Sequence, residues 1–457
     1  MTRSLERTLG PRDLILIVIG TVIGSGIFIV PASVLRDTGG DVRVALVVWL
    51  AAGVLSLLGA LTYGELGAAN PEAGGLYVYI RDAFGPLPAF LYGWTAFFVI
   101  GTGSVATLAV AFTGYLGQFV PVSPITAKVV AALMILVIMA INVRGVRHSA
   151  HVQNWTTGVK LVALAGMAVV LIAVGRGSAA PVAAPAAAGA PGAFSLLSGV
   201  GAAMIAVLWA YEGWQYVTFS AGETRDPQRI FPRAIVAGTA VVIVIYLLAN
   251  LGYLAAIGPE RAQHTDRIAA DAMTALFGPA AGKLIAAVIL VSMFSAANGL
   301  TLTSPRMYFA MAQDGVFFER LAEVHPRFGT PAFAVVAGSA WAMLLAVSGT
   351  FEQLLTYVVF AGWIFYALGA LSIFSYRRSR RRAAEAPTFQ VPGYPVTPIL
   401  FVAAAAAIVL NTLVTQPGRG LVGLGIVLLG TPVFYWWRAR AATPDPSLPR
   451  VPHARSG

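Results

Sequence analysis

The chain of 457 residues is 58% hydrophobic and only 11% charged, and its mean hydropathy is +0.78. A soluble domain needs more polar surface, so this composition indicates an integral membrane protein. The sequence contains no cysteine, which excludes a disulfide framework and thiolate metal sites. The net charge of +11 reflects how basic residues are distributed between the two sides of a membrane.

Apolar segments of about 20 residues recur along almost the whole chain, which predicts membrane-spanning helices rather than a barrel. The first begins near Leu14, and no cleavable signal is expected before it. Hydropathy and helix-breaking residues predict twelve spans: 14–35, 42–68, 86–119, 126–143, 152–175, 194–221, 232–258, 279–310, 331–348, 352–376, 396–414 and 420–438.

The basic residues predict the orientation of these spans. If the N-terminus lies inside, most of the 30 Lys and Arg residues fall in inside segments. We therefore expect a multi-pass protein of the cell (inner) membrane, with both termini in the cytoplasm. Residues 1–440 would form a single transmembrane domain. The Pro/Ala/Gly-rich segment 177–193 is expected to be an external flexible spacer, and residues 441–457 a disordered cytoplasmic tail.

Two of the predicted spans are interrupted. Span 14–35 contains Gly24-Ser25-Gly26, and span 194–221 contains the sequence WAYEGW at 209–214, which places Glu212 within the membrane. Irregular backbone at that depth is tolerated only where it is buried in protein or lines a cavity. The two spans run in opposite directions and start five spans apart. This predicts a repeat 14–175, an inverted repeat 194–376 and two additional spans within 396–438.

The two interruptions together favour binding of a zwitterion. A half-helix that begins near Gly26 offers free N–H groups and a positive dipole end to a carboxylate. Half-helices that end near Val22 and near Trp209–Ala210 offer free carbonyls to an ammonium group. An α-amino acid carries both groups a few ångströms apart. The alternative is that Gly20 and Gly24 form only a helix-packing face, but the matching interruption in the other span disfavours it.

Several stretches resemble the amino acid–polyamine–organocation superfamily of permeases, and most closely its branch of permeases similar to L-type amino acid transporters. They are GTVIGSGIF (20–28), YGELGAANPEAGGLYVYIRDAFGP (63–86), VQNWTTGVKLVALAG (152–166), LWAYEGWQYVTFSAGETRDPQRIFPRAI (208–235) and ANGLTLTSPRMYFAMAQDG (297–315). The resemblance covers most of residues 10–440. It implies an all-α fold similar to that of the leucine transporter, with five-plus-five inverted repeats and spans 1 and 6 unwound at mid-membrane.

The resemblance also implies roles for residues at the two interruptions. The residues that would bind the substrate carboxylate are Gly24, Ser25, Gly26 and Ile27. Those whose backbone carbonyls would bind its amino group are Val22, Trp209, Ala210 and Glu212. Trp209 would act as a gate over the substrate. Animal relatives link to a glycoprotein subunit through a loop cysteine. This chain has none, so no disulfide-linked partner is expected.

Lys160, one of only three lysines in the chain, lies within span 152–175. An intramembrane charge is by default a functional candidate, and lysine, unlike arginine, can release its proton when buried. By the resemblance, Lys160 would replace the sodium ion that other members of the fold bind. It would contact the Gly24 region and a hydroxyl of span 279–310, for which Ser295 is the candidate. This implies sodium independence and permits proton coupling. The alternative is that Lys160 extends to the membrane surface.

Glu212 has two interpretations. It could face the substrate and favour a cation, or it could hydrogen-bond neighbouring spans; we favour a structural or proton-linked role. A further set of charged residues near the cytoplasmic ends of spans is expected to form packing or gating pairs. The acids are Glu65, Glu223 and Asp314, and their expected partners are Arg81, Arg225 and Arg229.

The predicted function is secondary active transport of L-α-amino acids, preferably neutral ones, by alternating access. The mode would be exchange or proton-coupled symport, and no cofactor or metal is expected. One alternative is a permease or antiporter for cationic amino acids or polyamines. Another is an amino acid sensor that does not transport. A polytopic membrane enzyme is disfavoured, because no intramembrane His or Asp constellation suggests a nucleophile, a base or a metal cluster.

Overall fold

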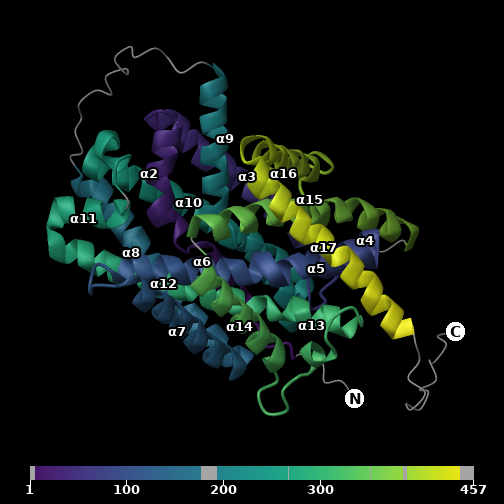
Figure 1. The fold of residues 1–457 in the computed structure, drawn as a ribbon. Helices are drawn as coiled ribbons and strands as arrows, with labels where there is room; N and C mark the ends of the chain where they lie inside the picture. The colour runs from purple at the N-terminus through teal and green to yellow at the C-terminus, as the bar shows by residue number, and fades with distance from the viewer. Residues whose placement is uncertain (1–5, 176–192, 266, 350, 384–388, 443–457) are drawn as a thin grey trace.

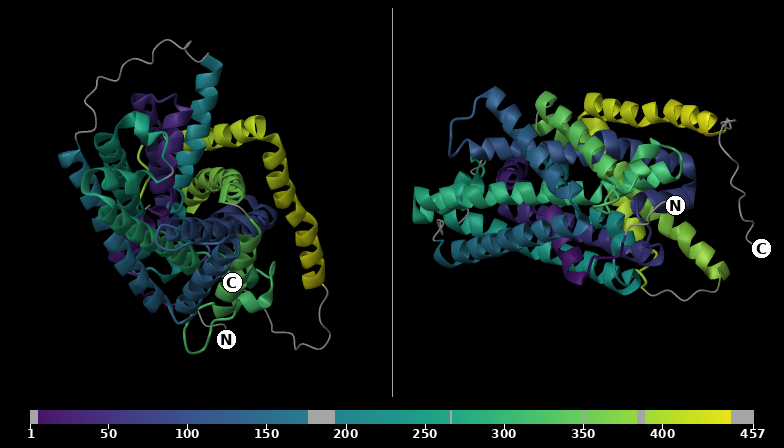
Figure 2. Two further views of the ribbon diagram at one scale, coloured as in Figure 1. Left: turned by 60° about the vertical axis from the view of Figure 1, so that its left-hand side comes forward. Right: turned by 90° about the horizontal axis from the view of Figure 1, so that it is seen from below.

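The computed structural model describes residues 6–175, 193–265, 267–349, 351–383 and 389–442. All regular secondary structure in these ranges is helical, as the sequence predicts (Figures 1 and 2). Almost all of the predicted spacer 177–193 and tail 441–457 lies outside the described residues.

Helices occupy the positions of all twelve predicted spans. In chain order they are α1 (Pro11–Val22) with α2 (Gly26–Asp37), α3 (Val42–Ala69), α5 (Pro86–Thr95) with η1 (Ala96–Ile100) and α6 (Gly101–Leu116), α7 (Pro124–Val143), α8 (Val146–Val174), α9 (Ala193–Ala210) with η2 (Trp214–Glu223), α10 (Pro227–Ala262), α12 (Pro279–Thr303) with α13 (Pro305–Gln313), α14 (Ala332–Ser348), α15 (Phe351–Ala383), α16 (Val396–Thr415) and α17 (Pro417–Ala442). Three short helices lie between them: α4 (Leu76–Phe84), α11 (Ile268–Phe277) and η3 (Glu319–Ala322).

Within the described ranges, nine helical segments are long and apolar enough to cross a membrane, and ten if α1 and α2 count as one bent span. The apolar helix α14 is shorter, at 17 residues. The chain is therefore a multi-pass membrane protein. Its count of twelve spans and its division into inverted repeats remain predictions.

The two interrupted helices meet inside the bundle. Helix α1 packs against α8, α10 and α12. Helix α2 packs along α9, as Figure 1 shows. The Thr21 hydroxyl at the end of α1 donates a hydrogen bond to the Gly213 carbonyl beyond α9, at 3.1 Å. Residues nearly 200 positions apart in the sequence thus become neighbours.

One end of the bundle, which the sequence predicts to be cytoplasmic, is closed by the segment before α1. Leu9 exchanges two backbone hydrogen bonds of 2.9 Å with Glu223 and Arg225. The side chain of Glu223 also forms an ion pair: its carboxylate lies 2.8 Å from the Arg306 guanidinium, and both side chains are only 1% exposed. Glu223 therefore pairs with none of the three arginines expected for this group of acids. Arg225 is exposed, whereas Arg306 extends inward from α13.

The other two acids of this group, Asp314 and Glu65, each form an ion pair with an arginine of another helix. Asp314 pairs with Arg81 at 3.0 Å, as expected, and both are about 30% exposed. Glu65 instead pairs with Arg377 of α15 at 2.6 Å and accepts a hydrogen bond from the Val391 N–H. These contacts join the ends of separate helices on the same side of the bundle.

Replacement of Glu223 by glutamine is expected to destabilise the protein strongly, because Arg306 would keep a buried charge without its partner. Breaking a buried ion pair on one side costs about 3–5 kcal/mol. The matched substitution Asp314→Asn breaks a partly exposed pair, for which the cost is about 0.2–1 kcal/mol. Thermal unfolding of the purified variants measures the difference. Equal unfolding midpoints for the two variants would contradict this prediction.

Candidate functional site

The first half of the site is the break between α1 and α2. Helix α1 ends at Val22, α2 begins at Gly26, and their axes differ by 44°. Within the described residues, the backbone N–H groups of Ser25, Gly26 and Ile27 have no hydrogen-bond acceptor. The Ser25 hydroxyl is also buried without a partner. The start of α2 therefore presents several free donors at the positive end of a helix dipole.

The carbonyls at the end of α1 are held by side chains from other helices. The fully buried Lys160 ammonium lies 2.7 Å from the Gly20 carbonyl and 2.5 Å from that of Ile23. The Ser292 hydroxyl of α12 lies 3.0 Å from the Ile23 carbonyl and 3.1 Å from the Gly24 carbonyl, and donates to one of them at a time. Cationic and hydroxyl donors therefore cap the negative end of α1 where the helix stops.

The second half of the site is the break after α9. Helix α9 ends at Ala210, and the chain turns at Gly213, where φ is +133°, before continuing as the 3-10 helix η2. Only glycine adopts that backbone conformation without strain. A Cβ at Gly213 would also lie 2.7 Å from the Thr21 carbonyl group. Glycine at this position allows the two breaks to approach each other.

Gly26, at the first break, likewise allows the two breaks to approach each other. A Cβ at Gly26 would lie 2.5 Å from the Ala210 Cα, closer than side-chain atoms normally approach. The start of α2 and the end of α9 are therefore in direct backbone contact. The donors of the first break and the carbonyls of the second thus face a common space.

Tyr246 of α10 joins the two breaks. Its hydroxyl lies 3.1 Å from the Val22 carbonyl and 2.9 Å from the Ala210 carbonyl. A hydroxyl carries one proton and donates to one acceptor at a time. One of these two carbonyls is therefore always free for another donor.

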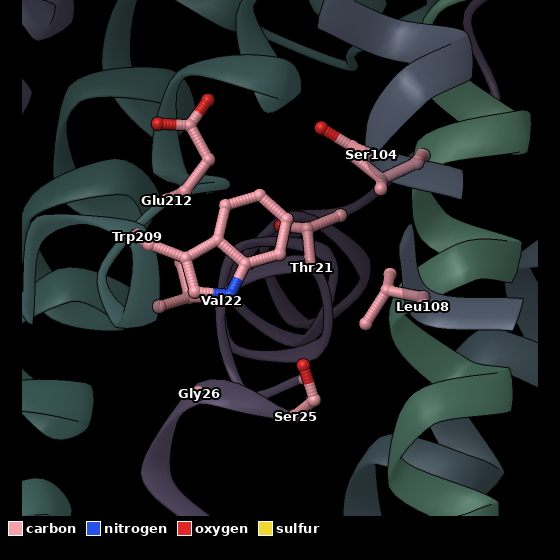
Figure 3. Close-up of a pocket in the computed structure, with 10 residues that line it drawn as sticks. Thr21, Val22, Ser25, Gly26, Ser104, Leu108, Trp209 and Glu212 are labelled. Atoms are coloured by element: carbon pink, nitrogen blue, oxygen red, sulfur yellow. The ribbon is translucent and has the colours of Figure 1, made fainter. Parts of the chain in front are cut away.

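A cavity lies between the breaks, and its volume of about 20 Å³ is enough for little more than one water molecule. Figure 3 shows the Trp209 indole across its centre, with Ser25 and Gly26 on one side, Glu212 on another, and Ser104 and Leu108 opposite. Trp209 is 6% exposed. The cavity is therefore too small for an amino acid in this structure, and the Trp209 indole is one of its walls.

Glu212 lines this cavity and also belongs to a buried polar cluster. Its carboxylate accepts hydrogen bonds from the Gln215 amide at 2.5 Å and from the Tyr366 hydroxyl of α15. The Gln215 amide also donates to the Tyr366 hydroxyl at 2.8 Å, and Tyr63 of α3 donates to the Tyr366 carbonyl. Glu212 therefore hydrogen-bonds a neighbouring span, as the favoured interpretation expects, while it remains next to the cavity.

The structure changes two expectations about Lys160. Its side chain is fully buried and extends to α1, so the alternative that it reaches the membrane surface is wrong. The serine beside it is Ser292, whose carbonyl lies 3.4 Å from the ammonium, rather than Ser295. The Ser295 hydroxyl instead hydrogen-bonds Thr156 and Thr157 of α8.

The remaining predicted site residues lie at the two breaks. Five of them line the cavity directly: Val22, Gly24, Ser25, Gly26 and Trp209. Ile27 and Ala210 adjoin it. Sequence reasoning did not find Ser104, Leu108, Leu300 or Tyr246, which come from three other helices. Their sequence surroundings are ordinary apolar spans and carry no signal of a site.

A metal centre is not supported by the described ranges, which contain no group of three His, Asp or Glu side chains placed to share an ion. A closed cavity between two interrupted helices of a multi-pass bundle is the architecture of a membrane transporter, with its site at facing half-helix ends.

Comparison with known proteins defines the class further. The amino acid permease family matches residues 9–435. The serine/threonine exchanger of Bacillus subtilis (strain 168) is 32% identical over 449 residues, which cover 96% of this chain and 99% of that protein. The b(0,+)-type amino acid transporter 1 of Homo sapiens is 32% identical, over 95% of this chain and 88% of that protein. The large neutral amino acids transporter small subunit 2 of Rattus norvegicus is 30% identical, over 94% and 81%.

The chain belongs to the amino acid permease family. This confirms the resemblance to the superfamily of amino acid permeases and to its L-type branch. The protein is therefore an amino acid transporter and not an enzyme.

Proposed function

We propose that this protein exchanges neutral L-α-amino acids across the cell (inner) membrane by alternating access, without sodium. The observation that carries the proposal is the pairing of free donors at the start of α2 with carbonyls at the end of α9, across one small cavity. Donors and acceptors a few ångströms apart match the carboxylate and ammonium groups of an α-amino acid. The exchange mode is supported by the relative named as a serine/threonine exchanger.

The substrate carboxylate would accept hydrogen bonds from the Ser25 hydroxyl and from the N–H groups of Ser25, Gly26 and Ile27, next to Gly24. The ammonium would bind backbone carbonyls of both breaks, for which the candidates are Val22 at the end of α1 and Trp209, Ala210 and Glu212 at the end of α9 and beyond it. Tyr246 would then donate to whichever carbonyl the ammonium leaves free. Trp209, which lines the cavity, would move aside as substrate enters and close over it as a gate.

Lys160 would take the place of a sodium ion at the end of α1. Its ammonium already supplies a positive charge to the Gly20 and Ile23 carbonyls, so no metal cation is needed there. Proton release from Lys160 would uncap α1, which leaves proton symport as the alternative coupling mode. The buried Glu223–Arg306 pair would separate when the cytoplasmic side opens.

The topological expectations belong to the same proposal. Both termini would lie in the cytoplasm, and residues 14–175 and 194–376 would form the inverted repeats that rock against each other. The chain has no cysteine for a disulfide-linked subunit, so we expect it to act without one. A sensor that binds amino acids but does not move them is the alternative that a transport assay distinguishes.

The proposal is tested with the full chain reconstituted into proteoliposomes. Uptake of labelled serine, leucine, lysine and glutamate is measured with the vesicles empty, loaded with unlabelled serine, or under a pH gradient. We expect uptake of the neutral amino acids to require internal amino acid and to be unchanged when choline replaces sodium. Uptake into empty vesicles driven by a pH gradient would identify proton symport instead. Absence of uptake under every condition would contradict transport.

Cationic amino acids are a second candidate substrate class, and one observation favours them. Glu212 lies at the cavity, and no Lys or Arg is paired with it among the described residues. A carboxylate in that position could attract a cationic side chain. Lysine uptake that exceeds leucine uptake, and that is lost in Glu212→Gln, would establish this class in place of neutral substrates.

Replacement of Ser25 by alanine is expected to raise the KM for transport roughly tenfold or more with little change in kcat. The variant loses one hydrogen bond to a charged group, which contributes about 1.5–3 kcal/mol, while the backbone donors remain. The matched control is Ser33→Ala on the same helix, whose hydroxyl bonds only the Val30 carbonyl. Initial rates of exchange against substrate concentration measure both constants. If the KM of Ser25→Ala equals that of the control, the Ser25 hydroxyl does not bind the substrate carboxylate.

A further inference from the structure

Two separate cavities lie between α14 and α17, away from the substrate site, and we refer to the pair as the groove. Helix α17 packs on α5, α15 and α16, and in Figure 1 it crosses the periphery of the bundle. One cavity in the groove, of about 370 Å³, lies between Trp341 and Leu345 of α14 and Leu429 of α17. A second, of about 580 Å³, lies between Ala337 of α14 and Trp437 of α17.

The two cavities follow one face of α14. The α14 residues that line them recur at helical spacing: Phe333, Ala337, Trp341, Leu345 and Ser348. From Phe333 to Leu345 this face is about 18 Å long at 1.5 Å per residue, comparable with the roughly 15 Å hydrocarbon depth of one leaflet. The groove therefore has the length of a lipid acyl chain.

The inner wall of the groove is apolar. The π-helical segment η1 places Phe97 in the larger cavity and Phe98 in the smaller one. The indole N–H groups of the flanking tryptophans are already used: Trp94 donates to the Ile426 carbonyl and Trp341 to the Phe98 carbonyl. Apart from the hydroxyls of Ser348 and Tyr357, the smaller cavity offers an occupant mainly ring faces and aliphatic side chains.

The larger cavity, unlike the smaller one, also has charged residues in its lining, one of each sign. Glu319 and Arg320 of η3 line it, both are exposed, and neither has an ion-pair partner within the described ranges. Two aromatic residues beside them are also exposed, Phe318 by 58% and Trp436 by 50%. Exposed aromatic rings next to charged groups are typical of the level of lipid headgroups.

We propose that this groove binds one phospholipid of the cytoplasmic leaflet, with an acyl chain along α14 and a headgroup that carries a phosphate and a primary ammonium. Arg320 binds the phosphate and Glu319 binds the ammonium, so the two charges of the rim match those of a phosphatidylethanolamine. A phosphatidylglycerol leaves Glu319 beside an anion. A phosphatidylcholine offers no N–H to donate. The choice of leaflet rests on the orientation proposed above.

The proposal is tested by native mass spectrometry of the full-length protein in detergent. Palmitoyl-oleoyl phosphatidylethanolamine, phosphatidylglycerol and phosphatidylcholine are added separately, and bound lipid is counted. We expect one tightly held phosphatidylethanolamine. Glu319→Gln should weaken this lipid roughly tenfold, as expected for one hydrogen bond to a charged group, and leave phosphatidylglycerol unaffected. Arg320→Gln should weaken both lipids, whereas Arg147→Gln, exposed on α8 at the same end of the bundle, should weaken neither.

Filling the groove provides an independent test. Ala337→Phe places a ring inside the larger cavity, and Ala340→Phe places the same ring on an exposed face of α14 one turn away. We expect only Ala337→Phe to lose the tightly held lipid. Equal retention by these two variants would overturn the groove as the site. If the protein retains the three lipids equally, and Glu319→Gln does not change the amount of bound lipid, the headgroup assignment is wrong.

Discussion

Replacement of Lys160 by alanine is expected to reduce exchange at least roughly tenfold at every pH. The Lys160 ammonium contacts the carbonyls of Gly20, Ile23 and Ser292 in a fully buried site. The buried Gly20 carbonyl would be left without its donor, whereas that of Ile23 would keep the Ser292 hydroxyl. A buried carbonyl without a donor costs about 1–3 kcal/mol, and about 1.4 kcal/mol corresponds to a factor of ten. The end of α1 would then no longer be held in the position from which the substrate site is built.

The matched control for this prediction is Lys283→Ala, which removes the same side chain from an exposed position on α12. Initial rates of serine exchange in proteoliposomes compare the two variants, with thermal unfolding as a measure of folding. Exchange by Lys160→Ala at the rate of the parent protein over the whole pH range would exclude Lys160 from the transport mechanism. Loss of parent activity when choline replaces sodium would contradict its role as a substitute for sodium.

Replacement of Gly26 by alanine is expected to reduce transport by roughly 5–150-fold, the factor that corresponds to the usual overpacking cost of about 1–3 kcal/mol. The added methyl would lie 2.5 Å from the Ala210 Cα and 2.6 Å from its Cβ. Because one of these contacts is to backbone, the start of α2 must move away from the end of α9. The carboxylate donors and the ammonium acceptors would then be too far apart for one substrate.

Gly114→Ala is the matched control, because Gly114 is also helical but has open space around its Cβ position. Substrate binding by the purified variants, measured by thermal stabilisation with serine, separates a lost site from a misfolded protein. We expect Gly26→Ala to remain folded with little stabilisation, and Gly114→Ala to behave as the parent. Full stabilisation of Gly26→Ala by serine would place the site elsewhere.

The positions of the helices and of both breaks could be predicted from the sequence because their causes are local. Hydropathy over about 20 residues marks each span, and glycine beside polar residues marks each break. Helix α1 ends at Val22 and α9 ends at Ala210, within a residue or two of the expected positions. The glycines at 24, 26 and 213 therefore indicate where the helices break without any knowledge of tertiary structure.

The partners across the bundle could not be predicted in the same way. Ser292 and Ser295 are three residues apart and share one face of α12, so spacing alone does not decide which reaches Lys160. Tyr246 and Arg306 come from helices distant in sequence, and their contacts depend on how α10 and α13 pack. Arg225 is close to Glu223 in sequence, but it is exposed in the structure.

The central claim is that the two breaks recognise the main-chain groups of an amino acid and not its side chain alone. Competition against labelled serine in proteoliposomes tests it directly, with serine, serinol and 3-hydroxypropionate as competitors. Serinol lacks the carboxylate and hydroxypropionate lacks the amino group, while both keep the hydroxyl. We predict that only serine competes at concentrations near its KM. Competition by either analogue as strong as that of serine would contradict a site that requires both groups.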